Sequence, residues 1–207
     1  MKKIITLGIL GILLASCSSD SENSEDNFFN LNTGNLRVYK RFISGDGITF
    51  SPTTRIDSVF TTGDTIISGL TYEKFYHKVY EADVFVEPHS FTETLRVDAN
   101  GHLVNVAGFV LHPGYDQNFT AIREYFLQDE LYGNINYQSE NPMDVMVEGE
   151  TYNVYPYIGN YIPLDPGQEE QSQFDYYKPG VGLVNQHCSA LMGTSCYEAR
   201  LISYQIN

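Results

Sequence analysis

The sequence predicts an all-β or mainly β protein, built as an antiparallel curved sheet, a sandwich or a half-barrel with at most one short helix. Three observations predict this class. Runs rich in β-branched and aromatic residues recur at short intervals, Gly, Pro, Asn and Asp separate the runs, and an Asn-Gly pair at residues 100–101 joins two of them. Short strands at such intervals are typical of antiparallel architectures.

The predicted strands follow one another along the chain. In the first half they cover residues 35–43, 55–60, 71–80, 91–97 and 103–106. In the second half we expect a hairpin over residues 144–155, which turns at Glu148-Gly149, and two final strands over residues 182–186 and 197–206. No composition break interrupts residues 28–207, so we expect this part to be a single β-rich domain.

The segment from Thr120 to Leu131 fits two kinds of element. Ile122 and Tyr125 have part of the spacing of an amphipathic helix, whereas Phe126-Leu127 fits a strand equally well. The pattern therefore leaves helix and strand open for this segment.

The 207-residue chain has a globular composition and a strongly acidic charge. Hydrophobic residues make up 42% and charged residues 18% of the chain, which is not the composition of a disordered protein. Twelve Lys and Arg stand against 26 Asp and Glu, which gives a formal charge of −14. Such a chain repels phosphate backbones and lacks a basic membrane-surface patch, so nucleic acid is excluded as a partner.

The N-terminus carries a processing signal. Lys2 and Lys3 precede an apolar run over residues 4–14, which is shorter than the roughly 20 residues needed to span a bilayer. The following sequence, LLASC, ends at Cys17 and resembles the lipobox of bacterial lipoproteins. This resemblance implies that residues 1–16 are a signal peptide, that Cys17 becomes thioether-linked to diacylglycerol, and that the lipid anchors the protein in a membrane.

The tract after Cys17 contains only Ser, Asp, Glu and Asn through residue 27. Without apolar side chains it cannot offset the entropy cost of folding, so residues 17–27 are predicted to be a flexible stalk. Ten such residues span about 16–19 Å as a random coil. The tract resembles the export signal of lipoproteins in Bacteroidetes-type bacteria. That resemblance implies an outer-membrane location facing the periplasm or the cell surface.

Two further stretches resemble parts of exported bacterial proteins. Residues 63–72, GDTIISGLTY, resemble a hairpin of exported Bacteroidetes proteins. Residues 176–184, YYKPGVGLV, resemble a strand near the end of uncharacterised bacterial lipoproteins. Some of those relatives are thought to form curved antiparallel sheets like the periplasmic lipoprotein carriers. The resemblance therefore implies an exported β domain and names no reaction. Gly180 and Gly182 would permit a turn with positive φ, or a bulge, ahead of the strand.

Three cysteines suggest one disulfide. Once Cys17 carries lipid, Cys188 and Cys196 remain, and an even remainder in an exported protein favours a bridge between them. A disulfide that closes so short a loop would stabilise the folded protein by about 2–3 kcal/mol, because it lowers the chain entropy of the unfolded state. The alternative, a Cys188 nucleophile activated by His187, has poor geometry because neighbours in a strand point to opposite faces.

Catalytic and metal-binding motifs are absent from the sequence. The histidines form no His-x-x-x-His pair, no Gly-x-Ser-x-Gly elbow occurs, and 26 acids make any carboxylate pair uninformative. Residues 98–101 match a fragment of a calcium loop but fit a plain turn better. We expect no catalytic residue, no cofactor and no metal. The five histidines are His77, His89, His102, His112 and His187.

Four tyrosines are close together in residues 151–161. Their rings could form a binding face for sugars or proteins, or could simply fill half-buried strand positions. The absence of Trp weakens the sugar alternative. The residues are Tyr152, Tyr155, Tyr157 and Tyr161.

Two short patterns are candidate modification sites. Asp57-Ser58-Val59 and Asp64-Thr65-Ile66 resemble the Asp-Ser/Thr-apolar pattern of O-glycosylation in Bacteroidetes. Ser58 and Thr65 are therefore candidate glycan acceptors, and ordinary strand and turn segments are the alternative.

These features favour a lipid-anchored envelope protein that is a non-catalytic binding or structural accessory module, with envelope proteins or glycans as candidate partners. A carrier of an apolar ligand inside a curved sheet is the alternative, followed by a glycan-processing enzyme. A large apolar concavity would favour the carrier. Converging carboxylates would favour the enzyme, and a flat tyrosine-rich face the binding module.

Overall fold

The computed structural model describes residues 27–189 and 196–207. Fourteen β-strands and one short 3-10 turn, η2 (Glu87–His89), occur in these residues, and none of their helices is long and apolar enough to cross a membrane. The strands are β1 (Leu36–Ser44), β2 (Ser51–Ile67), β3 (Leu70–Glu81), β4 (Val84–Phe85), β5 (Phe91–Val97), β6 (Leu103–Asn105), β7 (Val110–His112), β8 (Thr120–Leu127), β9 (Glu130–Ser139), β10 (Met143–Val147), β11 (Glu150–Pro163), β12 (Gln171–Lys178), β13 (Gly182–Ser189) and β14 (Cys196–Gln205).

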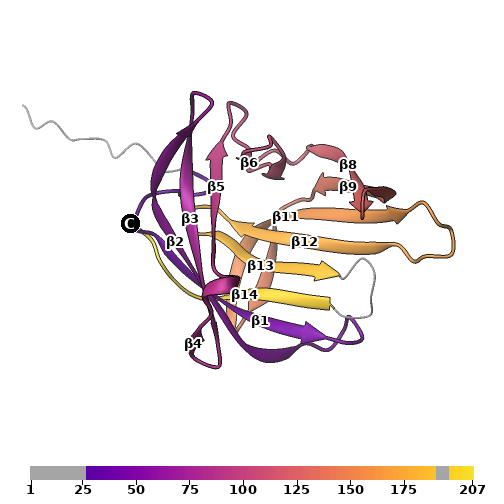
Figure 1. Cartoon of the computed structure of the whole chain (residues 1–207), viewed down its shortest axis with the longest axis horizontal. Coiled ribbons are helices and arrows are strands. Elements are labelled where there is room, and N and C mark those ends of the chain that lie inside the picture. Colours follow the sequence, from indigo (N-terminus) through magenta and orange to yellow (C-terminus); the bar gives the residue numbers. More distant parts are fainter. Residues whose placement is uncertain (1–26, 190–195) are drawn as a thin grey trace, which may run out of the picture.

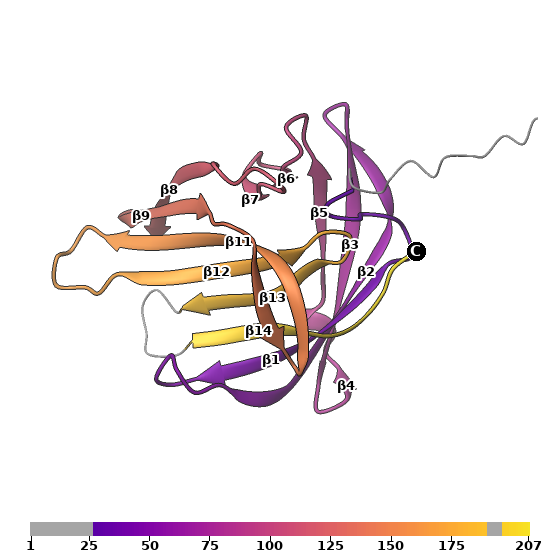
Figure 2. The same ribbon diagram turned by 180° about the vertical axis from the view of Figure 1, so that it is seen from behind.

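All strands belong to one open antiparallel sheet, which confirms the predicted fold class. The order is β7-β6-β5-β3-β2-β1-β14-β13-β12-β11-β9-β8, with β4 added to β3 and β10 added to β11. The last strand, β14, lies in the middle of the sheet beside β1. The sheet is strongly curved, so that β2, β3 and β5 stand across the direction of β11–β14 (Figures 1 and 2).

Tight turns set the register of the hairpins. Four two-residue turns have positive φ at both positions, the geometry that matches the right-handed twist of paired strands. They include the predicted turn at Glu148-Gly149 and a turn at Gln128-Asp129, where φ is 50° and 66°. The segment from Thr120 to Leu131 is therefore a hairpin formed by β8 and the start of β9, not a helix. The other two turns are Ser68-Gly69 and Ala82-Asp83.

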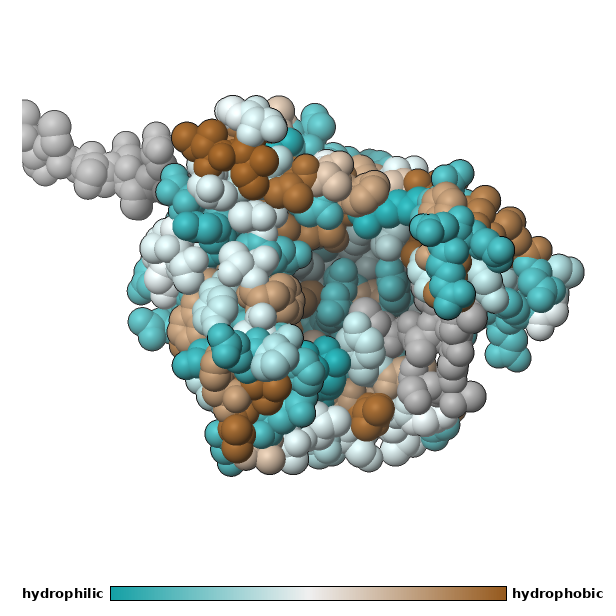
Figure 3. All heavy atoms as spheres, viewed as in Figure 1, coloured by the Kyte–Doolittle hydropathy of each residue, from teal (hydrophilic) through white to brown (hydrophobic). Residues whose placement is uncertain are grey.

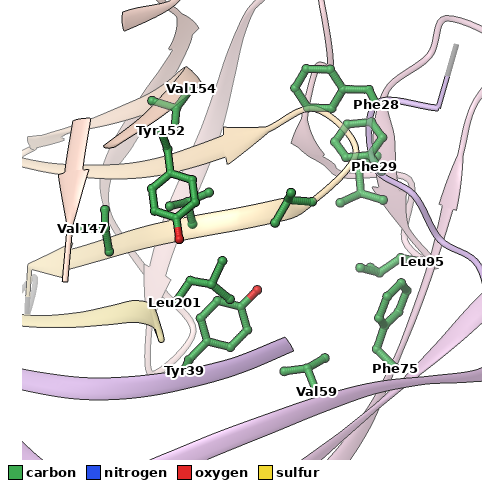
Figure 4. Packing of buried hydrophobic residues seen from close by; sticks show 13 residues of the cluster. Phe28, Phe29, Tyr39, Val59, Phe75, Leu95, Val147, Tyr152, Val154 and Leu201 are labelled. Atoms are coloured by element: carbon green, nitrogen blue, oxygen red, sulfur yellow. The ribbon is translucent and has the colours of Figure 1, made fainter. Parts of the chain in front are cut away.

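The core contains residues from distant parts of the sequence. The β10–β11 hairpin contributes Val147, Tyr152 and Val154, and the segment before β1 contributes Phe28 and Phe29 (Figure 4). All five are less than 7% exposed. Burial of such residues supplies most of the stabilisation of a fold without helices.

One face of the molecule is hollow. Figure 3 shows a depression between the region formed by β2, β3 and β5 and the region formed by β8 and β9, with hydrophilic residues along much of its wall. Both regions belong to the same curved sheet, so the depression lies on its concave side. A cavity on the inner side of β1–β3 and β5 is the candidate site.

Candidate functional site

The cavity has a volume of about 100 Å³ and a mainly apolar wall. It lies where β1, β2, β3, β5 and β6 meet the turn between β12 and β13. Three ionisable side chains, Arg37, His77 and Glu93, interrupt the apolar wall. The remaining lining residues are Phe29, Leu31, Tyr39, Val59, Phe75, Leu95, Leu103, Tyr177, Gly182 and Leu183.

The strand registers place the ionisable groups together. His77 in β3 pairs with Val59 in β2 and with Phe91 in β5. Because directly opposed residues share a face and alternate residues return to it, Asp57 and Glu93 lie on the same face as His77. The ring of His77 stacks on Phe91 with centroids 4.2 Å apart.

His77 lies between two carboxylates. Its Nδ1 is 3.1 Å from Asp57 Oδ2, and its Nε2 is 3.7 Å from Glu93 Oε2. The second contact is an ion pair and not a hydrogen bond, since 3.7 Å is too long. The side chains of His77, Asp57 and Glu93 are 15%, 28% and 39% exposed, so Glu93 lies nearest to solvent.

The carboxylates keep His77 charged. Burial would lower the pKa of His77, but Asp57 and Glu93 stabilise the imidazolium and raise the pKa to about 9. A histidine that is protonated at neutral pH cannot serve as a general base there. The cluster therefore supplies a fixed cation between two anions.

This ion cluster predicts a stability that falls at alkaline pH. Because the pKa of His77 is higher in the folded protein than the ordinary 6.5, the stabilisation is complete below pH 6.5 and is lost as pH rises through 9. We expect a loss of up to about 3 kcal/mol in the free energy of unfolding. Urea titrations between pH 6.5 and 9.5 would measure it. In the variant His77→Gln, the free energy of unfolding should fall much less between these pH values. An equal fall would mean that other groups cause the pH dependence.

Arg37 is buried at the other side of the cavity. It is 4% exposed, and its guanidinium donates hydrogen bonds to three backbone carbonyls. Nε donates to Val181 O, and Nη2 donates to Phe29 O at 3.3 Å and to Asn30 O at 3.0 Å. Arg37 thus joins three separate segments: β1, the turn before β13 and the segment before β1.

Two tyrosines complete the wall between these charges. The hydroxyl of Tyr39 donates to Leu183 O at 3.0 Å, and burial raises the pKa values of Tyr39 and Tyr177 far above the ordinary 10. Both hydroxyls therefore stay neutral at any physiological pH. Each tyrosine presents an apolar ring with one polar edge to the cavity.

Sequence reasoning did not identify this cavity. The available signal was a charged residue on an otherwise apolar strand face: His77 between Phe75 and Val79, and Glu93 between Phe91 and Leu95. Only the pairing of β3 with both β2 and β5 brings these charges together.

Most of the proposed tyrosine face is buried. Tyr152, Tyr157 and Tyr161 are 6%, 2% and 1% exposed. Tyr155 packs against Phe28, with ring centroids 5.3 Å apart. The alternative of tyrosines that fill strand positions therefore describes them, and they do not form a flat binding surface.

The structure does not show the predicted disulfide between Cys188 and Cys196, which stays a prediction. Cys196 is a free thiol, and the side chain of Cys188 is outside the described part. In the hairpin, Cys188 pairs with Tyr197 and Cys196 with Ser189. The ring of His187 stacks on Phe174 with centroids 4.8 Å apart, and its Nδ1 lies 3.6 Å from Glu198 Oε1.

The remaining predicted residues lie elsewhere. Cys17 is outside the described residues. Ser58 and Thr65 are half-buried in β2, where they pair with Lys78 and Tyr72 of β3. Their glycosylation stays a prediction. An intact mass equal to that of the lipidated polypeptide would contradict it.

His112 illustrates a structural histidine. Its Nδ1 accepts a hydrogen bond from Gly114 N, and its Nε2 donates to Tyr155 O, each at 3.0 Å. Burial lowers its pKa to about 4, so it is neutral. Within residues 27–189 and 196–207, no three His, Cys, Asp or Glu side chains are placed to hold a metal ion.

Comparisons with known proteins identify the fold. No protein-family description and no curated protein matches the sequence. One similar structure is the crystal structure of an inferred exported protein from Bacteroides fragilis, which is described as having a YmcC-like fold. Its TM-score is 0.50 and its sequence identity is 11%. The match covers 86% of this chain and 98% of that one. An inferred lipoprotein from Parabacteroides distasonis has a TM-score of 0.47 and 13% identity, with the same coverage. At 11% identity, the first likeness shows a shared fold.

Proposed function

We propose that this chain is a lipid-anchored protein of the bacterial cell envelope that binds a small ligand in the cavity of its concave face, without catalysis. The observation that carries the binding proposal is the cavity itself. An apolar pocket with a few fixed polar groups is the usual form of a small-molecule site. Outer-membrane anchoring through Cys17 rests on the lipobox resemblance, and the inferred export of the structurally similar Bacteroides protein agrees with it.

The size of this cavity argues against a long acyl chain bound inside it; a larger hollow of about 820 Å³ lies elsewhere, beside β7 and β8. An apolar cavity of about 150 Å³ accommodates benzene, and one water occupies about 30 Å³ in the liquid. A cavity of about 100 Å³ therefore accepts only a small aliphatic group. An acyl chain of a membrane lipid would need several times this volume.

The polar groups of the cavity also disfavour hydrolysis by a pair of carboxylates. Asp57 and Glu93 both face the ring of His77, which lies between the two carboxylates. A glycosidase dyad requires two carboxyl groups that face the sugar between them. The cluster is better suited to hold charge in place than to transfer protons.

A substitution that fills the cavity tests the binding proposal. Val59 is 7% exposed and lines the cavity, so Val59→Phe should occupy much of the free space. We expect Val59→Phe to weaken the binding of small aliphatic probes at least tenfold, measured by ligand-observed NMR. The matched control is Val97→Phe, at an exposed position outside the cavity wall. Equal binding by wild type and Val59→Phe would contradict the proposal.

The anchoring proposal has its own test. We expect Cys17→Ala to release the protein from the membrane fraction, because the variant has no sulfur for the thioether. Cys196→Ala should leave the protein membrane-bound and serves as the matched control. Immunoblots of fractionated cells measure the distribution, and a Cys17→Ala protein that stays in the membrane would contradict lipid anchoring.

A further inference from the structure

We infer that the ligand of the cavity is a small aliphatic monocarboxylate, whose carboxylate binds Arg37 and whose alkyl group occupies the apolar wall. This inference rests on the proposed binding function and names its ligand class. It depends on three properties of the cavity: a buried cation without an acidic partner, an apolar lining and a small volume.

Arg37 has an unused hydrogen-bonding edge. Its hydrogen bonds use Nε and Nη2, and Nη1 has no hydrogen-bond partner within residues 27–189 and 196–207. All three acceptors are neutral backbone carbonyls, and no carboxylate of the described chain forms an ion pair with Arg37. A guanidinium that is 4% exposed without a counter-ion is costly, and a carboxylate is the partner that best matches its geometry.

The acids near the cavity are already engaged. Glu93 and Asp57 flank the protonated His77, and Asp175, close to Tyr177, accepts a hydrogen bond from Gln186 Nε2 at 2.9 Å. His77 is therefore compensated by its own strands. Arg37 is the cation of the cavity that no carboxylate contacts, which makes it the expected anchor for an anion.

The apolar wall determines the rest of the ligand. Val59, Leu95 and Leu183 line the space together with aromatic rings, and none of the three offers a side-chain hydrogen bond. The volume of about 100 Å³ is about two thirds of that of a cavity that accommodates benzene, so the cavity admits only a short alkyl group. This matches a branched or straight chain of two to four carbons attached to the carboxylate.

Three probes that share one isopropyl group show which charge the cavity prefers. Isobutyrate, isobutyramide and isobutylamine are titrated into the full-length protein at pH 7, and their dissociation constants are measured by calorimetry or ligand-observed NMR. We expect isobutyrate to bind at least ten times more tightly than either of the other probes, because only it can pair with Arg37. Valproate, which has a larger alkyl group, should bind at least ten times more weakly than isobutyrate.

The variants separate this inference from the binding proposal. Arg37→Met should abolish the preference for isobutyrate over isobutyramide, and Arg37→Lys, which keeps the charge, should retain part of it. If Arg37→Met does not fold, the three probes on the wild-type protein still decide. Equal or tighter binding of the amide or amine overturns the inference and leaves the binding function intact. If none of the probes binds to the wild-type protein, the binding function itself fails.

Discussion

Replacement of Arg37 by methionine should lower the free energy of unfolding by about 4 kcal/mol, because three backbone carbonyls in buried or partly buried hydrogen bonds lose a charged donor at once. The loss is more than the removal of one contact. Phe29 O and Asn30 O lie in the segment that places Phe28 and Phe29 in the core, and Val181 O lies in the turn that begins β13. The substitution therefore loosens two segments that depend on the same side chain.

Chemical denaturation monitored by circular dichroism measures this effect. Arg55→Met is the matched control, because Arg55 forms only a partly exposed ion pair with Glu81 at 3.7 Å. Ion pairs of this kind contribute less than about 1 kcal/mol. If Arg37→Met were within 1 kcal/mol of the wild type, the carbonyls would have found water instead, and Arg37 would not hold the two segments together.

The strands with strong local patterns could be predicted from the sequence. β5 coincides with the predicted residues 91–97, and β1 differs from the prediction by one residue at each end. These segments alternate between an inner and an outer face, and tight turns such as Asn100-Gly101 delimit them. Alternation and turn chemistry are local properties, so a single sequence contains them.

The strands without such patterns were missed. β9 and β12 carry many amides and hydroxyls, and the sequence ELYGNINYQS of β9 has little alternation. Both strands are paired on two sides, β9 with β8 and β11, and β12 with β11 and β13. Their backbone hydrogen bonds to neighbours stabilise them where side-chain burial is small. This pairing depends on distant residues, which a local pattern does not reveal.

The candidate site could not be predicted from the sequence for the same reason. Arg37 and His77 are 40 positions apart, and the cavity lies between strands whose adjacency follows from the sheet order. The sequence patterns placed His77 and Glu93 in strands correctly, but they could not show that those strands are paired. The tyrosines of residues 151–161 suggested a binding face because they are close together in the sequence. In the structure most of them are buried, so they do not form that face.

Substitution of Gly133 by alanine should destabilise the protein by about 3 kcal/mol, although it adds a single methyl group. A Cβ atom at this position of β9 would lie 2.5 Å from Ile162 O and 2.6 Å from Tyr161 Cε2. Tyr161 is 1% exposed, and its hydroxyl donates to Tyr132 O at 3.2 Å. The ring is therefore fixed against the glycine and cannot move aside without losing that bond, and the carbonyl belongs to the paired strand β11.

Gly45→Ala provides the matched control for this clash. Gly45 lies in the loop after β1, and apart from its chain neighbours no atom of the described residues lies within 4 Å of a Cβ there. The same substitution should therefore change the free energy of unfolding by less than about 0.5 kcal/mol. Urea denaturation of the two variants in parallel measures the difference. A Gly133→Ala protein as stable as Gly45→Ala would show that β9 and β11 can separate to admit a methyl group.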